Sequence, residues 1–564
     1  MPTARDLVQT MINVGRLLLR PWTGMQRFVV LLCVSLLLVV SCGPKPSADG
    51  PSAVNNGDFI TIGTTSKLRT LDPADAYDIF SGILLNNMGE RLYTYELGST
   101  KLVPQLATAL PEVSEDGLTY IIPLREGVQF HDGTPFNAKA MAFSLRRFIE
   151  NGGQPSFLLA DAIESVKPTA EYELTIELKQ PFSALPALLS FFGACAVSPK
   201  AYDVGPGKFA PDTFVGTGPY KLARYGPDLL QLQAFDQYWG EKPANPGVSI
   251  QLLTDAPNLF NAFQTGAVDV AYQNLEPEQV QNLRQDADKS GWKVIEAQGT
   301  GVTYLVLNLK QEPLDNVAVR RAIAAIVDRP LINKRVYQGQ AEPIYSLLPT
   351  AFESYSPVFK ESYGDGNAEV AQKYLDEAGY STENPLRLEL WYPSNSVPRS
   401  LIASLLKAFA KDKLDGAVEL EINSVDSATA FQNVSKGIYP SLLVTWFPDF
   451  FDPDTYIQPF LSCLKGSQEE GCEEGASQSQ GSFYYSDDAN ALVKQQRRTL
   501  DPEKRQAIFG ELQEILADDV PYIPLVQSKE YAFAQQNIEG VQISPTQQFP
   551  FWTLQRDTAQ AQEN

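Results

Sequence analysis

The segment TWFPDFFDPDTYIQPF, residues 445–460, concentrates side chains that could hold a charged ligand. Aromatic residues alternate there with the carboxylates of Asp449, Asp452 and Asp454. A partly exposed surface tolerates this mixture poorly unless it binds something flat or cationic, because aromatic faces and carboxylates both attract cations. The alternative is an aromatic cluster that fastens two domains together, and the sequence leaves both interpretations open.

Groups for covalent catalysis or metal binding are scarce. His131 is the one histidine, so a Ser-His-Asp or Cys-His mechanism would depend on it, and no histidine cluster can form. It lies in a turn between a strand and a helix, which favours a structural role. Cys195 has apolar neighbours and nothing near it in the sequence that would activate a thiolate. Without a Gly-x-Ser-x-Gly motif or convincing paired carboxylates, we expect no enzymatic activity, no resident metal and no cofactor.

Length and charge limit the domain number and the partners. The 564 residues are too many for one compact core and predict two or three domains, and the hydrophobic share of 44% is typical of a globular protein. The formal net charge is −22. Nucleic acid is therefore not expected as a partner, because phosphate binding requires clustered lysines and arginines.

The N-terminal region has the features of an export signal. The apolar run FVVLLCVSLLLVV is too short to span a bilayer comfortably but suits the hydrophobic part of a signal peptide. The VVSC at its end resembles the lipobox of bacterial lipoproteins, which implies that residues 1–41 are removed and that Cys42 is diacylated. An uncleaved membrane anchor is the alternative. Residues 42–57, rich in Pro, Gly, Ser and Asn, predict a flexible tether, and a start at Met25 rather than Met1 would give a more typical signal.

The strongest local structure signals lie in residues 102–148. Ser114–Gly117 is a polar turn and Thr119–Arg125 is rich in β-forming residues, which together predict a hairpin. Asn137 is the predicted N-cap of a helix that begins at Ala138. The apolar side of that helix would consist of Met141, Leu145 and Phe148.

Other elements follow from the same kinds of signal. The segment FITIGTT predicts a strand, followed by a turn-rich segment and a helical stretch that continues to Tyr93. The segment LRLELWYPS, a helix around Leu401–Phe409 and the segment AVELEINSVD form a strand, helix, strand unit, which implies locally parallel pairing. Asp501 and Pro502 begin a further helix that ends before Pro521.

Several phrases together resemble the signature of the large solute-binding proteins of ABC importers (family 5), which capture peptides and nickel. They are DGLTY, LREGVQFHDGTPF, GTGPYKLARY and LFNAFQTGAVDVAY. The resemblance implies an α/β fold like that of periplasmic binding proteins (type II, cluster C), with two lobes, a hinge and an extra domain. Lobe 1 would hold domain I (residues 58–88, 206–300 and 528–557) and domain II (residues 89–205), and domain III (residues 301–527) would be lobe 2.

The resemblance also assigns candidate ligand-binding residues. In peptide-binding members, the acidic residue three positions after a tryptophan pairs with the α-ammonium of the ligand, and here Asp449 follows Trp446 at that spacing. We expect Trp446 and Phe447 to contact the ligand as well. The main chain expected to line the cleft, unless the segment is an ordinary loop, consists of Ile79, Phe80 and Ser81.

By this resemblance the protein would be the lipid-anchored, monomeric substrate-binding component of an ABC importer, which captures peptides between its lobes and delivers them to a membrane permease. It would lie in the cell envelope, in the periplasm or on the outer face of the cytoplasmic membrane. The same fold with a nickel chelate, haem or a sugar as ligand is an alternative, since the missing histidine cluster argues only against direct nickel coordination. An exported hydrolase and an envelope scaffold are the further alternatives.

Cys463 and Cys472 form an even pair in a chain that we expect to be exported. We therefore predict a disulfide that closes a loop of about ten residues and contributes about 2 to 3 kcal/mol to stability. Two free thiols are the alternative.

Overall fold

The computed structural model describes residues 59–546 and 548–557. The predicted signal peptide, the predicted lipidation site Cys42, the tether and both candidate start positions lie outside these residues. No helix among the described residues is both long enough and apolar enough to cross a membrane.

A sheet of eleven strands is the main structural element. β1 and β10 pair in parallel, whereas the two longest strands, β12 and β19, lie near its middle and pair antiparallel. β13 (Ala341–Pro343) pairs with β19 beside the main path. In spatial order the other strands are β15 (Val418–Val425), β14 (Leu386–Pro393), β16 (Ser441–Trp446), β12 (Lys293–Leu307), β19 (Tyr522–Ala534), β11 (Val270–Tyr272), β1 (Ile60–Thr64), β10 (Gly247–Leu252), β9 (Leu229–Ala234) and β8 (Tyr220–Arg224).

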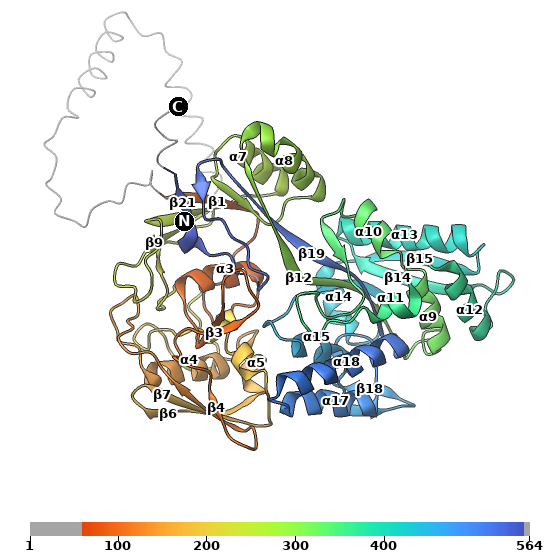
Figure 1. The fold of residues 1–564 in the computed structure, drawn as a ribbon, viewed down its shortest axis with the longest axis horizontal. Coiled ribbons are helices and arrows are strands. Elements are labelled where there is room, and N and C mark those ends of the chain that lie inside the picture. The colour runs from red at the N-terminus through yellow and green to blue at the C-terminus, as the bar shows by residue number, and fades with distance from the viewer. Residues whose placement is uncertain (1–58, 547, 558–564) are drawn as a thin grey trace, which may run out of the picture. The chain divides into compact units, whose positions relative to one another are not determined.

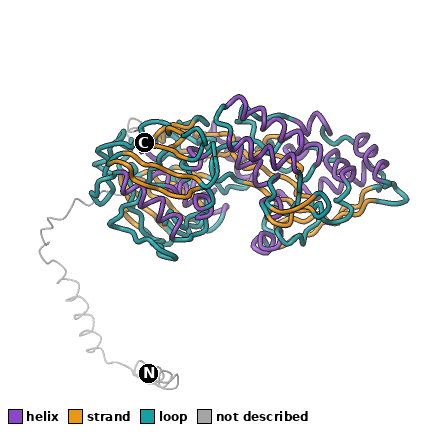
Figure 2. Tube along the Cα trace, turned by 90° about the horizontal axis from the view of Figure 1, so that it is seen from below, coloured by secondary structure: helices purple, strands orange, loops and turns teal. Residues whose placement is uncertain are grey.

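Two lobes are joined through β12 and β19, which run from one to the other (Figure 1). The apolar core of lobe 2 is built from residues between Val302 and Val526. Lobe 1 has separate cores, one from Leu92 to Ala196 and others around β1, β10 and β11. Figure 2 shows the lobes side by side. The predicted two-lobed α/β fold is confirmed, and the finer division into three domains stays a prediction.

Smaller sheets complete both lobes. In lobe 1 a four-stranded antiparallel sheet packs against helix α4 (Ala138–Glu150), and its strands are β4 (Glu112–Val113), β5 (Thr119–Pro123), β7 (Glu173–Leu178) and β6 (Ile163–Ala170). The two-stranded sheets are β2 (Tyr93–Tyr95) with β3 (Leu102–Pro104), β17 (Lys465–Ser467) with β18 (Gly471–Glu474), and β20 (Ile538–Glu539) with β21 (Gln555–Arg556).

Helices cover the sheets of each lobe. Besides α4, lobe 1 contains α3 (Ile79–Met88), α5 (Ser156–Ala160), α6 (Leu185–Leu188), α7 (Ala256–Gln264), α8 (Pro277–Ser290) and the 3₁₀ helices η2 (Phe192–Ala194) and η3 (Phe551–Thr553). Lobe 2 contains α9 (Val317–Ala325), α10 (Arg329–Arg335), α11 (Val358–Tyr363), α12 (Ala368–Ala378), α13 (Val397–Lys413), α14 (Ser427–Val434), α15 (Asp454–Leu461), α16 (Ala476–Ser479), α17 (Asp487–Arg498) and α18 (Pro502–Asp519).

Local signals predicted several of these elements well. The Asn137 side chain caps α4, where it accepts hydrogen bonds from the backbone of Lys139 and Ala140. Strands β14 and β15 pair in parallel, with α13 between them in the chain, as predicted. The predicted helical stretch to Tyr93 was wrong at its end: α3 stops at Met88, and Tyr93 begins β2.

The residue that follows α3 is Gly89, in an extended conformation. A Cβ at this position would lie 2.8 Å from the Phe214 ring and 3.1 Å from the Cys195 sulfur. Close packing at the end of α3 therefore favours a glycine.

Candidate cleft between the lobes

Three adjoining cavities lie between lobe 1 and lobe 2, and we call them together the cleft. The first, of about 60 Å³, is lined by α3 residues such as Ile79 and by Asp449 in the connection between β16 and α15. The middle cavity is narrow, of about 10 Å³, and shares Ile79 and Thr300 with the first. The third, of about 290 Å³, shares Phe447 and Glu530 with the middle one. Residues of both lobes line the cleft, so closing the lobes encloses whatever is bound there.

Asp449 is the acidic group of the first cavity. One of its oxygens accepts a hydrogen bond of 2.7 Å from the hydroxyl of Tyr77. Tyr77 belongs to lobe 1, so this bond joins the two lobes across the cleft. Burial raises the pKa of Asp449 to about 6, and the hydrogen bond from Tyr77 offsets part of the rise. The ionised carboxylate is thus poorly solvated.

The other two aspartates of this segment have arginine partners. Asp452 accepts hydrogen bonds of 2.8 and 2.6 Å from Arg505. Asp454 accepts hydrogen bonds of 2.8 and 2.6 Å from Arg497. Such bidentate pairs neutralise a carboxylate at short range. Of the three aspartates, Asp449 is therefore the one that faces a cavity and forms no ion pair with another described residue.

Part of the aromatic segment fastens the lobes together. Phe450 packs edge-on against Phe182 of lobe 1, with ring centroids 6.3 Å apart. Phe451 packs in the same way against Tyr95, with centroids 6.1 Å apart. Edge-to-face pairs at these distances are favourable contacts. The interpretation of the segment as an aromatic cluster between domains therefore holds for these two phenylalanines.

Phe447 and Trp446 take other positions than Phe450 and Phe451. The side chain of Phe447 is 41% exposed and lines the middle and third cavities, as expected for a residue that meets a ligand. Trp446 is not among the residues that line the three cavities. Its ring packs against Phe460 inside lobe 2, with centroids 5.4 Å apart. The structure thus gives Trp446 a packing position behind the cleft.

Helix α3 presents its first residue to the cleft. Ile79 lines all three cavities. Phe80 belongs to the core of lobe 1, and the buried hydroxyl of Ser81 donates a hydrogen bond of 2.9 Å to the carbonyl of Thr70. Of the three residues expected to line the cleft, the structure therefore places only Ile79 there, and all three belong to a helix rather than a loop.

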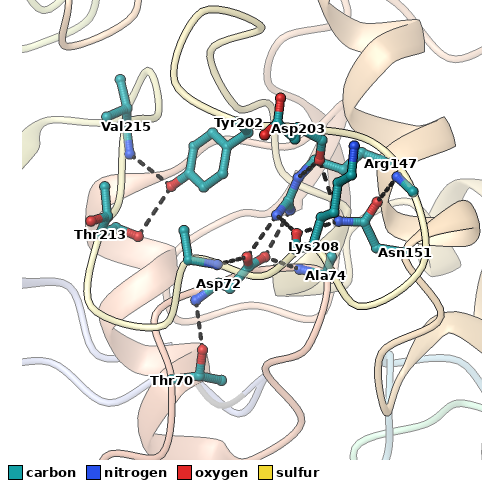
Figure 3. A network of polar contacts seen from close by, with 12 residues as sticks. Thr70, Asp72, Ala74, Arg147, Asn151, Tyr202, Asp203, Lys208, Thr213 and Val215 are labelled. Carbon is teal, nitrogen blue, oxygen red and sulfur yellow. Dashed lines mark hydrogen bonds and ion pairs between the residues drawn. The ribbon is translucent and has the colours of Figure 1, made fainter.

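A buried ion pair fixes the segment that leads into α3. Figure 3 shows the Arg147 side chain pointing at Asp72, and the two form hydrogen bonds of 2.7 and 2.6 Å. Asp72 also accepts hydrogen bonds from the backbone of Ala74 and Ala210. Asp72 is fully buried and the Arg147 side chain is 2% exposed, so the pair is shielded from solvent. This network holds the chain just before Tyr77 and thereby positions both Tyr77 and α3.

Two polar residues of the cleft, Tyr77 and Glu530, carry no signal in the sequence. Tyr77 lies two positions before the predicted segment, but nothing local indicates that its hydroxyl meets Asp449. Glu530 lies in β19 and lines the middle and third cavities. Burial raises the pKa of Glu530 to about 7, and a hydrogen bond with the Gln273 side chain offsets part of the rise. No sequence motif marks this glutamate.

His131 and the cysteines of the described residues take structural positions in the fold. His131 Nε2 lies 3.0 Å from the carbonyl oxygen of Gly218, and burial lowers the pKa of His131 to about 4. Cys195 is buried, and burial raises the pKa of its thiol to about 12. Cys463 and Cys472 are joined by a disulfide. Among the described residues no group of three or more His, Cys, Asp or Glu could hold a metal ion.

Comparisons with known proteins show the family to which the chain belongs. The family model described as bacterial extracellular solute-binding proteins, family 5, middle region, matches residues 101–468. A dipeptide-binding protein of Escherichia coli strain K12 is 27% identical over 519 residues, covering 87% of this chain and 90% of that protein. A di/tripeptide-binding protein 2 of Pseudomonas aeruginosa strain UCBPP-PA14 is 25% identical, covering 93% of this chain and 98% of that protein.

The fold is also that of solved binding proteins. The periplasmic binding protein DppA from Helicobacter pylori, solved in complex with the peptide STSA, superposes with a TM-score of 0.72. The two chains are 22% identical, and the match covers 89% of this chain and 98% of that one. At this identity the similarity concerns the fold.

Proposed function

Since the chain belongs to family 5 of the bacterial extracellular solute-binding proteins, we propose that it is the peptide-binding component of an ABC importer. The cleft would capture peptides with a free N-terminal ammonium, and the closed, loaded form would deliver them to a membrane permease without covalent chemistry. A lipid on Cys42 would hold the monomeric protein in the cell envelope, in the periplasm or on the outer face of the cytoplasmic membrane. Domains I and III would enclose the peptide, with domain II attached to the first lobe.

The observation that carries this proposal is the Asp449 carboxylate. It faces a cavity and is poorly solvated, and its neighbours Asp452 and Asp454 have arginine partners, whereas no arginine in the described part of the chain pairs with Asp449. A peptide ammonium would supply the missing charge through charge-assisted hydrogen bonds. The carboxylate can accept this donor as well as the Tyr77 hydroxyl, since an ionised carboxylate has about four acceptor sites. The names of the two relatives, which bind dipeptides or tripeptides, support peptides as the ligand class.

Titration calorimetry with two forms of one peptide tests the proposal. Tri-alanine with a free amino terminus should bind, whereas N-acetylated tri-alanine should bind about 10- to 100-fold more weakly, which is the affinity that a hydrogen bond to a charged group contributes. The Asp449→Asn variant should bind the free and the acetylated peptide with similar affinity. The Glu421→Gln variant, with an exposed substitution on β15, should keep the wild-type difference in affinity. Equal binding of both forms by the wild type would remove Asp449 from the site.

Native mass spectrometry of the purified protein separates the ligand classes. A heterogeneous set of short peptides released from the protein would support the import proposal. A single mass of a nickel chelate, a haem or a sugar would keep the fold but change the ligand. A protein that carries nothing and that no peptide pool stabilises against heat would instead favour an envelope scaffold.

The lipid anchor needs its own experiment, since Cys42 lies outside the described residues. In cells that carry the Cys42→Ser variant, the protein should leave the membrane fraction, because a lipid on this residue is the proposed attachment. Palmitate labelling should mark the wild type alone. Unchanged membrane association of the variant would contradict lipidation at Cys42.

A further inference from the structure

The middle and third cavities contain a second carboxylate, that of Glu530. This residue lies on β19, opposite Ala297 of β12, and it is the one charged residue among those described that line the middle cavity. The middle cavity shares Ile79 and Thr300 with the first cavity, beside Asp449, and it shares Ile79 and Phe447 with the third. An extended ligand that starts at Asp449 therefore passes Glu530 as it continues.

No lysine or arginine of the described chain forms an ion pair with Glu530. The neighbouring Lys529 also lines the third cavity, but its ammonium lies 2.6 Å from the carboxylate of Glu296. Consecutive residues of a strand point to opposite faces, so Lys529 and Glu530 diverge. Tyr272 and Gln273, which also interact with Glu530, carry no positive charge.

The residues opposite Glu530 are polar and conformationally constrained. Gln273 and Asn274 both have positive φ angles, of 61° and 60°, although neither is a glycine. Such backbone strain tends to occur at ligand-binding positions, where the surrounding structure maintains it. The Asn274 amide donates a hydrogen bond of 2.6 Å to the Ser66 hydroxyl, which holds this strained turn beside the cavity. Across the cavity, the buried hydroxyl of Ser528 has no hydrogen-bond partner among the described residues.

We propose that Glu530 binds a second positive charge on the ligand, so that the cleft selects peptides that carry a basic side chain in addition to a free amino terminus. The inference rests on the proposed function, because it assumes that a peptide occupies the cleft from Asp449 onward. The basic side chain occupies the third cavity. The Glu530 carboxylate accepts its hydrogen bonds, and the Ser528 hydroxyl is an unused polar group in the lining of that cavity.

The cost of leaving Glu530 without a cation favours this selection. Burial raises the pKa of Glu530 to about 7, which means that ionisation is disfavoured in the ligand-free protein. A lysine or arginine side chain restores the ionised form and makes charge-assisted hydrogen bonds with it. An apolar side chain of the same length fills the same volume but encloses the carboxylate without compensation.

A matched pair of peptides isolates the second charge. The tripeptides Ala-Lys-Ala and Ala-Ala-Lys are compared by calorimetry at pH 7 with the same tripeptides containing norleucine, which has the lysine chain without the ammonium. At one of the two positions the lysine peptide should bind about 10- to 100-fold more tightly than its norleucine counterpart. In Glu530→Gln this ratio should fall to about 1, whereas in the exposed Glu421→Gln it should keep the wild-type value.

The outcomes separate this inference from the proposed function. Peptide binding with a lysine-to-norleucine ratio near 1 at both positions would overturn the role of Glu530 and leave the proposed function intact. A preference that persists in Glu530→Gln would overturn it as well. Binding of no peptide at all would overturn the proposed function and the inference together. If Glu530→Gln does not fold, Glu530→Asp replaces it, since the shorter carboxylate should reduce the ratio without abolishing it.

Discussion

The affinity for a peptide should depend on pH through Asp449. In the ligand-free protein burial raises the pKa of this carboxyl to about 6, and a bound ammonium stabilises the ionised form and lowers the pKa again. Binding is therefore strongest above pH 6, where the carboxylate is already ionised. As the pH falls below 6, the ligand must displace a proton from the Asp449 carboxyl, so the affinity decreases further as the pH is lowered. The loss continues until the pH reaches the pKa of the complex.

The size of this loss follows from the pKa of the free carboxyl. At pH 7 about a tenth of Asp449 is protonated, and at pH 5 about nine tenths, so the dissociation constant should rise about tenfold between these values. Tri-alanine suits the measurement because its amino group, with a pKa near 8, and its carboxyl, with a pKa near 3.5, keep their charges over this range. His131 does not interfere, since burial lowers its pKa to about 4.

Calorimetric titrations at constant ionic strength from pH 7 to pH 5 provide the assay. Asp449→Asn should bind weakly and show no such slope. The same series in the Glu530→Gln background removes the contribution of the second carboxylate, whose pKa lies near 7. A dissociation constant for the wild type that stays constant from pH 7 to pH 5 would refute the assignment of Asp449 as the ammonium partner.

Three further outcomes are expected. Asp449→Asn should raise the free energy of unfolding of the ligand-free protein by about 1 to 3 kcal/mol at pH 7, because the ionised carboxylate of Asp449 destabilises the fold. Urea unfolding should show this gain at pH 7 and no gain near pH 4. Tyr77→Phe removes a hydrogen bond that favours ionised Asp449, so the pH at which peptide affinity falls should move upward by about one unit in the calorimetric series. Asp72→Asn leaves buried Arg147 without its counter-charge and should lower the free energy of unfolding in urea by about 3 to 5 kcal/mol. Asp75→Asn removes a more exposed ion pair and should lower it by less than about 1 kcal/mol. Equal losses in the two variants would contradict the role of burial.

Elements with local causes were predictable from the sequence. Helix α4 has a side chain that caps it and an apolar side that repeats at helical spacing, and both are visible within a dozen residues. The parallel pairing of β14 with β15 follows from the helix between them, since a crossover connection of this kind returns the chain in the same direction. The end of α3 at Met88 was missed, and the packing of the following Gly89 against Phe214 involves a residue distant in sequence.

The polar contacts of the cleft could be predicted only in part. The resemblance placed Asp449 near the ligand, and the structure adds that its neighbouring aspartates are neutralised by Arg497 and Arg505. Tyr77 reaches Asp449 across 372 positions of sequence, so no local pattern could indicate the pair. Glu530 lies in a strand whose sequence, SKEYAFA, also fits a solvated face. Its enclosure becomes apparent only when both lobes are in place.

The strands that form the cleft are also those that join the lobes. The pairing of β12 with β19 shifts in register between Gln298 and Val302, and such an irregularity interrupts the hydrogen-bond ladder and lets the strands bend. Glu530 contributes to the cleft from β19 on the lobe 1 side of this interval, and Asp449 contributes from lobe 2. If a peptide binds both carboxylates as proposed, it spans the bend, and its charges favour the closed arrangement over the open one. A peptide that lacks one charge would then leave a carboxylate enclosed without compensation, so the two contacts proposed to select the ligand would also determine how far the lobes stay closed.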